Sequence, residues 1–471
     1  MNNKIVRVAI LFAVLLLIKS NAFSQEPSVS PTPEKQEVVA VTNKTPDENV
    51  SKSEAPVPTQ TPAPAPSPKP DFWHWEKMTG DWDGDRERLK SEGLEMDFKF
   101  TQFYQGVAAG GVRRGSEYNA IFETSFKMDL GKMKPSLKFW LLEVHSETRF
   151  GGPVLGGTGA INPVNTAALL PASDGSAVSV TSFYFTRLIP KDLAKGDLFA
   201  VSFGRFNIID LIDEDFFAGL GTERFFNVAQ VGPLTAARQI PLITNGANLT
   251  YIKGGEPRFS FTVLDPNDHS LNPGLKDLFA DGVTVSPTFF IPTKHFGKSA
   301  KHSFGGAVTT KAYTPFDDIR LINLPGPPRT PVEAQRGSWS LSYAFRQYIV
   351  EGERKDGWGF FSQVSISDKD TSPITTFFDF GLGGNGLFKS RPRDEFGISY
   401  AYTDLSEVLK DNLNLLTLAG RRPRVEHQFE AFYNFHLTPW LRLTGDLQII
   451  RPTQAIANTA VVPGARLVMI F

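Results

Sequence analysis

The sequence predicts an all-β protein, a 16-stranded antiparallel transmembrane β-barrel preceded by a short helix and a disordered, proline-rich arm. The first observation is that apolar and polar side chains alternate with a period of two in sixteen segments, as strands with one lipid-facing side require. The second is that several connections between these segments are clearly short and others clearly long. The third is the end of the chain, where Leu467, Met469 and the terminal Phe471 are apolar at spacings of two. A soluble β-sandwich is the alternative, but it has no reason to sort its connections by length.

The composition fits a barrel in a lipid bilayer and excludes other classes. The chain has 471 residues, of which 12% are aromatic, and no cysteine. Its mean hydropathy is −0.18, and a barrel combines such a value with many aromatic residues because only alternate strand residues are apolar. Without cysteine there are no disulfide bonds or thiolate metal sites. With 49 Lys and Arg against 50 Asp and Glu and no basic stripe, we expect no nucleic-acid partner.

Residues 1–24 are predicted to be a secretory signal peptide. Lys4 and Arg7 precede an apolar run at 8–18, which is too short to span a membrane. The small residues Ala22 and Ser24 follow, so we expect cleavage after Ser24, with a retained anchor as the alternative. Secretion by this route predicts a final location in the bacterial outer membrane.

Residues 25–70 are predicted to form a disordered periplasmic arm. They contain 11 prolines and neither glycine nor an aromatic residue, so they cannot bury a core and should be semi-extended. We interpret the arm as a spacer. The alternative is contact with peptidoglycan or a periplasmic partner, which would make the protein an adhesin or structural anchor.

Residues 71–94 are predicted to hold a short helix ahead of the barrel. Asp83 or Asp85 is placed to cap its start, and Gly93 is placed to end it. Together with Asp81 these aspartates resemble half of a calcium loop, but no glutamate stands at the twelfth position. We therefore expect helix capping and no metal site.

Residues 95–471 are predicted to form the barrel. The alternating segments are 96–104, 118–130, 137–147, 178–188, 198–206, 247–253, 258–264, 282–291, 302–312, 337–349, 357–367, 374–382, 394–403, 425–436, 441–450 and 460–471. Short connections are expected at 131–135, 254–257, 350–356 and 437–440, and long ones at 148–177, 207–246, 314–336 and 404–423. From a periplasmic N-terminus, these short connections fall on the periplasmic side and these long ones outside. An even number of strands also returns the C-terminus to the periplasm.

Several motifs, in this order and spacing, together resemble the OprB-like family of carbohydrate-selective porins. They are Thr79-Gly80-Asp81-Trp82-Asp83-Gly84 with Arg86 and Leu89, Gly110-Gly111-Val112-Arg113-Arg114-Gly115, Phe203-Gly204-Arg205-Phe206-Asn207, the hairpin of 246–251 with 263–267, Arg391-Pro392-Arg393-Asp394-Glu395-Phe396-Gly397, and Thr438-Pro439-Trp440-Leu441 with Asp446-Leu447-Gln448. The resemblance implies a 16-stranded porin through which sugars diffuse, past a constriction carrying arginines and acidic residues. The chain departs from the family pattern in its long arm and in Asp83 and Asp85 around Gly84, which puts a role of the N-terminal helix in doubt.

A sugar path needs fixed hydrogen-bond donors and acceptors, because a sugar is neutral and rich in hydroxyl groups. Arginine supplies five donors in a rigid fork, and carboxylates accept. The candidates for the path or its constriction are Arg113, Arg114, Glu123, Arg205, Asp210, Asp213, Asp215, Arg238, Glu430 and Asp446. The connection 207–246 is longer than an idle one needs, and we expect it to fold inward as the constriction. For each charge taken alone, a solvated loop or wall position is the alternative.

Arg205 is the candidate on which the selectivity hypothesis depends most. It has the parity of Phe199, Val201 and Phe203, so an inward direction requires a bulge at the outer end of its strand. Near-equal numbers of opposite charges favour a sugar pore, with a general or anion-selective, phosphate-like porin as the alternative.

An enzyme of the outer membrane is a rival of a different class. The seven histidines are scattered and fit no hydrolase or metal-binding spacing, so we expect no catalytic residues, metal or cofactor. Carbohydrate solutes and outer-membrane lipid are the expected partners, and both a monomer and a homotrimer fit the sequence.

Overall fold

The structure is a computed structural model that describes residues 71–152, 157–168, 178–211, 221–232, 234–316, 334–352, 357–416 and 422–471. The predicted signal peptide and arm, residues 1–70, lie outside the described residues, as do the candidate site residues Asp213 and Asp215.

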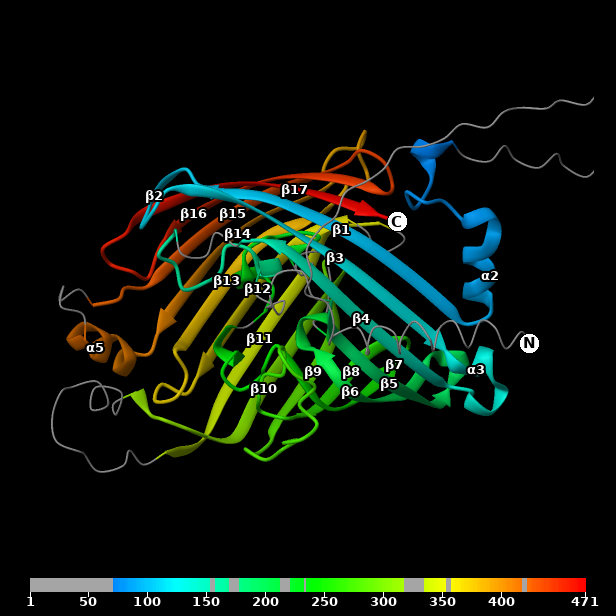
Figure 1. The fold of residues 1–471 in the computed structure, drawn as a ribbon, viewed down its shortest axis with the longest axis horizontal. Coiled ribbons are helices and arrows are strands. Elements are labelled where there is room, and N and C mark those ends of the chain that lie inside the picture. The colour runs from blue at the N-terminus through cyan, green and yellow to red at the C-terminus, as the bar shows by residue number, and fades with distance from the viewer. Residues whose placement is uncertain are drawn as a thin grey trace, which may run out of the picture. The chain divides into compact units, whose positions relative to one another are not determined.

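The described chain forms one closed antiparallel sheet (Figure 1). Its strands are β1 (Leu94–Val107), β2 (Ala109–Gly111), β3 (Gly115–Asp129), β4 (Trp140–Gly151), β5 (Ser179–Asp192), β6 (Asp197–Asn207), β7 (Ile243–Lys253), β8 (Glu256–Leu264), β9 (Thr284–His295), β10 (Lys298–Tyr313), β11 (Gln335–Glu351), β12 (Gly357–Ser367), β13 (Ile374–Asn385), β14 (Glu395–Leu405), β15 (Glu426–His436), β16 (Leu441–Arg451) and β17 (Asn458–Ile470). The three-residue β2 lies in a connection, and the other sixteen strands form the wall, each overlapping one predicted segment. The predicted fold class is confirmed.

The last strand closes the barrel against the first. β1 pairs with β3 on one side and with β17 on the other, where Lys99 lies opposite Ile470 and Tyr104 opposite Ala465. The pairing continues to the end of the chain, because the Phe471 amide donates to the Phe98 carbonyl at 2.9 Å. No edge strand therefore remains in the wall, as a transmembrane sheet requires.

The two faces of the wall differ in chemistry as the alternation predicts. On β16, Leu443 and Leu447 are 41% and 40% exposed on the outer face, whereas the residues that follow them, Thr444 and Gln448, are at most 1% exposed. In a barrel this pattern means an apolar, lipid-facing exterior and a polar interior. The interior positions are buried because chain segments fill part of the lumen.

The connections at the two ends differ in kind. Figure 1 shows α2 (Asp85–Ser91), α3 (Leu130–Met133) and the C-terminus at one end, and β2 and α5 (Glu407–Leu416) at the other. The predicted short and long connections fall at these opposite ends. Sorting by length is not general, however, since residues 368–373 and 452–457 make short connections at the α5 end.

The N-terminal helix is present, but its predicted cap is wrong. α2 spans Asp85–Ser91, and its N-cap is Gly84 in the left-handed conformation, with no side-chain cap bond. Asp83 has φ of 55° within the preceding turn, and Asp85 is already the first helical residue, paired with Arg88 at 2.9 Å. The helix ends at Ser91, two residues before Gly93. Both carboxylates therefore miss the capping position, although Asp85 still complements the helix dipole.

The segment before α2 packs on the α2 end of the barrel through aromatic rings. The indole of Trp440 donates to the Phe72 carbonyl at 3.0 Å, and the two rings lie 4.9 Å apart. The Met78 amide donates to the Ile470 carbonyl at 2.7 Å. Among the described residues, no helix combines the length and the apolarity that a membrane crossing demands.

Candidate functional site

Two connections enter the barrel and fill part of its lumen. We call residues 157–168, from the β4–β5 connection, and residues 221–232 with 234–242, from the β6–β7 connection, the lumen loops. They bond to one another, because the Thr166 amide donates to the Phe226 carbonyl at 2.6 Å and the Val228 amide to the Pro163 carbonyl at 3.1 Å. The described part of 207–246 therefore turns inward as expected, but it does so together with a second loop that we did not expect.

The lumen loops rest on apolar contacts with the wall. One cluster joins Phe226 and Ala167 of the loops to Phe103 and Ile121 of β1 and β3. Another joins Phe225 to Phe361 and Phe432 of β12 and β15. The apolar core of this barrel thus lies inside the lumen, between loop and wall, and burial of these rings stabilises the folded loops.

Side chains of β15 to β17 bind the backbone of the lumen loops. Arg466, which is 1% exposed, donates to the carbonyls of Gly221 at 2.7 Å, Glu223 at 2.6 Å and Arg224 at 2.8 Å. Glu430 accepts the Asn227 amide at 3.1 Å. Both side chains are buried and bond to the loop backbone, so they anchor the loops.

Two predicted site residues belong to this anchor and not to an exposed constriction. Glu430 and Asp446 are 1% and 7% exposed, and Gln448 donates to both Asp446, at 3.1 Å, and the Val164 carbonyl, at 2.9 Å. Their inward direction follows from strand parity. Their role follows from loop contacts that parity does not reveal.

A chain of alternating charges links the wall to the lumen loops. Lys99 of β1 lies 3.1 Å from Glu123 of β3 and 3.3 Å from Glu223 of the second loop, and Arg442 of β16 lies 3.0 Å from Glu223. Burial alone would raise the pKa of Glu223, but the positive charges of Arg442 and Lys99 outweigh it and hold the pKa well below its ordinary value. Glu223 therefore remains ionised at neutral pH.

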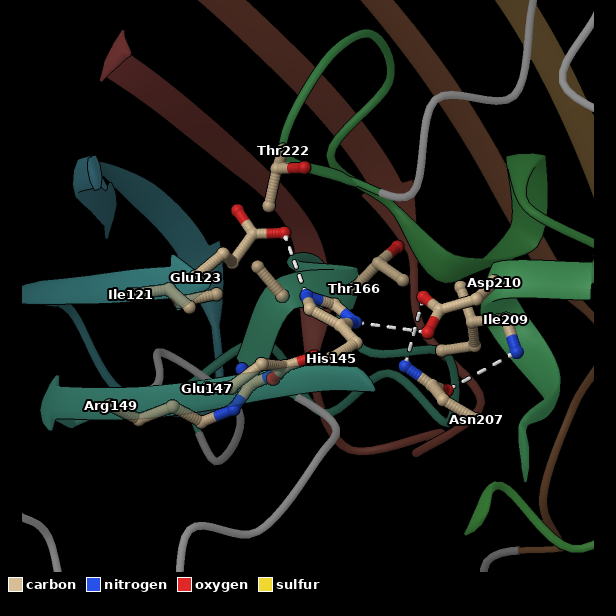
Figure 2. A pocket seen from close by; sticks show the side chains of 11 residues that line it. Ile121, Glu123, His145, Glu147, Arg149, Thr166, Asn207, Ile209, Asp210 and Thr222 are labelled. Atoms are coloured by element: carbon tan, nitrogen blue, oxygen red, sulfur yellow. Dashed lines mark hydrogen bonds and ion pairs between the residues drawn. The ribbon is translucent and has the colours of Figure 1, made fainter. Parts of the chain in front are cut away.

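A small cavity lies beside this chain, where β3 and β4 meet the start of the β6–β7 connection (Figure 2). His145 lies 3.0 Å from Asp210 through its Nδ1 atom and 3.9 Å from Glu123 through its Nε2 atom. Ser182 donates to Asp210 at 2.9 Å. The cavity of about 30 Å³ is lined by these carboxylates and Thr222 and by the apolar side chains of Ile121 and Ile209, and it has room for a water molecule. The predicted residues Glu123 and Asp210 thus meet through a histidine that we did not single out.

The opposite wall of the lumen carries neutral hydroxyl and amide groups. Half-buried inward side chains on β6 to β11 are Ser202, Asn248, Thr250, Ser260, Thr262, Ser286, Thr288, Ser303 and Ser342. Some bond to one another, as Asn248 does to Ser260 and Thr262 at 2.7 Å each. These side chains are uncharged donors and acceptors, and Lys301 and Arg346 lie opposite each other on the same inward face of β10 and β11.

Arg205 does not face the lumen. Its guanidinium donates to the carbonyls of Val180 at 2.9 Å, His269 at 2.7 Å and Asn272 at 2.8 Å. The register of β6 with β7 runs without a shift past Arg205, so there is no bulge to turn the side chain inward. The arginine holds the β8–β9 connection, and these contacts do not support the constriction role predicted for it.

The other predicted arginines lie at the α5 end of the barrel. Arg113 and Arg114 are exposed in the connection between β1 and β3. Arg238 is exposed in the second lumen loop, with its guanidinium 4.4 Å from the ring centre of Tyr313.

Residue-by-residue reasoning missed the partners of the predicted acids. Lys99 lies between Phe98 and Phe100, and Arg442 between Leu441 and Leu443, so the alternation placed each charge on the lumen face. That signal was available for both residues. No alternation indicated the position of Glu223, because it lies in a loop.

Comparisons with known proteins agree on one family. The family model for the carbohydrate-selective porins, OprB family, matches residues 102–471. Porin B of Pseudomonas aeruginosa is 23% identical over 180 residues, which cover 35% of this chain and 39% of that protein. The match thus spans less than two fifths of that relative's length.

Solved structures share the fold. The high-pH structure of Pseudomonas putida OprB has a TM-score of 0.71 at 19% identity, covering 85% of this chain and 100% of that chain. The low-pH structure of the same protein has a TM-score of 0.51 at 16% identity, covering 84% of this chain and 99% of that chain.

Proposed function

This chain belongs to the OprB family of carbohydrate-selective porins, and we propose that it lets carbohydrates diffuse passively across the outer membrane through the partly filled lumen. Family and fold are those of channels, which supports a path whose residues bind and position a solute. The observation that carries the proposal is the pairing of charges along the lumen.

Paired charges suit a neutral, hydroxyl-rich solute. Lys99 and Arg442 each contact a carboxylate, and Arg224 lies 3.3 Å from Glu395. Such pairs leave fixed donors and acceptors for hydroxyl groups while their fields largely cancel. A phosphate-selective pore needs an uncompensated excess of positive charge at the constriction. We therefore favour sugar over anion passage.

The uncharged side chains on the wall of β6 to β11 support the same solute. A sugar that enters a narrow lumen loses water from its hydroxyl groups, which costs free energy unless other hydrogen bonds replace the lost ones. Side chains such as Ser202, Thr250 and Thr288 offer both donors and acceptors on that wall. We place the sugar path between this wall and the lumen loops.

Seven of the ten predicted residues then take roles that fit their positions. Glu123 and Asp210, with Lys99, His145, Glu223 and Arg442, border the constriction. Glu430 and Asp446, with Arg466, fix the lumen loops. Arg113, Arg114 and Arg238 lie at the outer mouth, where they meet the solute first.

We extend the proposal to the segments outside the described residues. Residues 1–24 are removed as a signal peptide, residues 25–70 remain in the periplasm as a spacer, and residues 71–94 join this arm to the barrel. Contact of the arm with peptidoglycan or a periplasmic partner is the alternative. The same permeation unit serves a monomer and a homotrimer.

Permeation measurements on the purified protein test the proposal. Liposomes containing the protein should swell faster in glucose than protein-free liposomes, and reversal potentials in a phosphate gradient should show little preference for the anion. Phosphate entry far above glucose entry would instead support the anion-selective alternative.

The variant Arg466→Ala tests the role of the lumen loops. Loss of its three carbonyl contacts should free the second loop, raise single-channel conductance and admit larger sugars. Arg451→Ala is the matched control, because Arg451 is exposed on the outer face of the neighbouring strand β16. Equal conductance of the two variants would mean that the lumen loops do not form the constriction.

A further inference from the structure

The outside of the barrel carries a groove at the periplasmic ends of β9 to β12. Its volume is about 680 Å³, and its lining includes His295, Phe296, Lys298, His302, Phe345 and Phe360. His302 shares its strand parity with Phe304 and Val308, which are 47% and 52% exposed on the lipid-facing side. The groove therefore faces the membrane and is separate from the sugar path.

A bulge in β11 gives the wall its irregular shape at this place. The register of β11 with β12 shifts between Tyr348 and Val350. Tyr348, which also lines the groove, packs against the buried Phe225 cluster of the lumen. A bulge bends its strand and turns side chains away from the regular alternation, so the outer surface is indented there.

The floor of the groove combines aromatic rings with imidazole groups. The His302 ring lies 4.7 Å from that of Phe345, which lies 5.5 Å from that of Phe360. Nδ1 of His302 is 2.8 Å from the hydroxyl of Tyr343, while its Nε2 has no hydrogen-bond partner in the part of the chain that the structure describes. A polar group that faces lipid needs a hydrogen-bond partner, and Nε2 of His302 is free to bond to a ligand.

The rim of the groove is positively charged. Lys298 lines the groove, on the same outward parity as His302. Lys294 across the tight turn and Glu351, which accepts the Ser299 amide at 2.8 Å, have the opposite, lumen-facing parity. Lys298 thus places one positive charge beside the two imidazoles.

The turn itself is unusual in a way that points to lipid. Phe296 and Gly297 form a two-residue turn with φ values of 52° and 74°, a geometry that normally selects Asn or Gly at both positions. Phe296 is fully exposed, and a left-handed conformation is unfavourable for a bulky residue. An apolar ring recovers such a cost where it inserts into a membrane. Phe296 thus places the end of the groove at the membrane boundary.

We propose that this groove binds an anionic phospholipid of the periplasmic leaflet. Its phosphate lies against Lys298 and His302, and an acyl chain lies along Phe345 and Phe360. Basic pockets at the membrane surface bind lipid headgroups in this way. The aromatic floor provides an apolar surface for the acyl chain.

Lipid add-back to the delipidated, full-length protein tests this proposal. Native mass spectrometry should show one phosphatidylglycerol retained per barrel, and much less retention of the zwitterionic phosphatidylcholine. The double variant Lys298→Gln with His302→Gln should weaken phosphatidylglycerol retention about 10-fold. Lys253→Gln is the control, because Lys253 is exposed at the neighbouring β7–β8 turn and should leave retention unchanged.

Several results would overturn the proposal. Equal retention by wild type and double variant, or equal retention of the two lipids, would mean ordinary annular lipid. Binding of inorganic phosphate alone, with the same dependence on Lys298, would mean an anion site. A dimer that the double variant dissociates would mean a protein interface. If the double variant does not yield a heat-modifiable barrel, Lys298→Gln alone carries the test, since Lys298 begins its strand next to the turn.

Discussion

Two arginines of this barrel bind backbone carbonyls. Arg466 does so inside the lumen, where it is buried, and Arg205 does so at the outer end of β6. Each guanidinium satisfies several carbonyls that no strand pairs, which is a role that a fixed fork of donors fits well. The charge of an arginine near a pore is therefore a poor guide to its function until its partners are known.

The variant Arg205→Ala should leave sugar permeation unchanged. Its three bonds hold the β8–β9 connection, so their loss should lower the free energy of unfolding by about 1–3 kcal/mol. Liposome swelling and thermal unfolding in detergent measure the two effects, with Arg451→Ala as the exposed control. A fall in glucose flux with unchanged stability would show that Arg205 contributes to the sugar path.

The variant Glu223→Gln should lose stability in a pH-dependent way. Because the pKa of Glu223 is lowered in the folded state, its charge stabilises the fold above the ordinary carboxyl pKa, and this contribution is lost as the pH falls through the folded-state pKa. Wild type should thus unfold at a higher temperature than the variant at pH 7, by roughly 2–4 °C. The gap should narrow below about pH 4.3, the ordinary value for glutamate.

Melting temperatures at a series of pH values, with exposed Glu117→Gln as control, measure that difference. A gap that stays constant down to strongly acidic pH would show that the charge of Glu223 does not contribute to stability.

At the scale of elements, strands were predictable and loops only in part. Period two locates a strand and its inward side, because one face must be apolar in lipid, and all sixteen wall strands followed from it. The length of 207–246 indicated an inward loop. The partners of that loop were not predictable, since Glu430 and Arg466 meet Asn227 and Glu223 only after the barrel closes.

The closing strand depends on its last residue. Phe471→Ala should reduce the amount of protein in the outer membrane several-fold, because the end of β17 must pair with β1 to remove both edges. Immunoblots of outer-membrane fractions measure this, and Ile456→Ala, at an exposed connection, is the control. Normal levels of the Phe471 variant would mean that the rest of β17 suffices for insertion.

At the scale of the whole molecule, the barrel should permeate sugar without the arm. Deletion of 25–70 should leave single-channel conductance and glucose flux unchanged, because a proline-rich segment without aromatic residues cannot form pore wall. Planar-bilayer recordings of both forms compare them. A conductance that falls by half or more would assign the arm to the channel.

Only some residues of the candidate site were predictable, and their arrangement was not. Glu123 and Asp210 were singled out separately, and His145, which joins them, offered no motif. Asp83 and Asp85 failed as caps because a left-handed turn, set by Gly84, moved the helix start by one position. Alternation fixes which way a side chain points, whereas contacts across the lumen depend on loops whose backbone path it does not describe.

The wall side chains that hold the lumen loops bond to main-chain atoms. Arg466 donates to three carbonyls, and Glu430 accepts from an amide. Every amino acid has a carbonyl, and every one but proline has an amide hydrogen. Loop side chains that face the solute can therefore be substituted while the contacts to the loop backbone remain. A barrel built in this way is a stable frame around an exchangeable filter, and related chains can acquire new solute preferences through loop side chains alone.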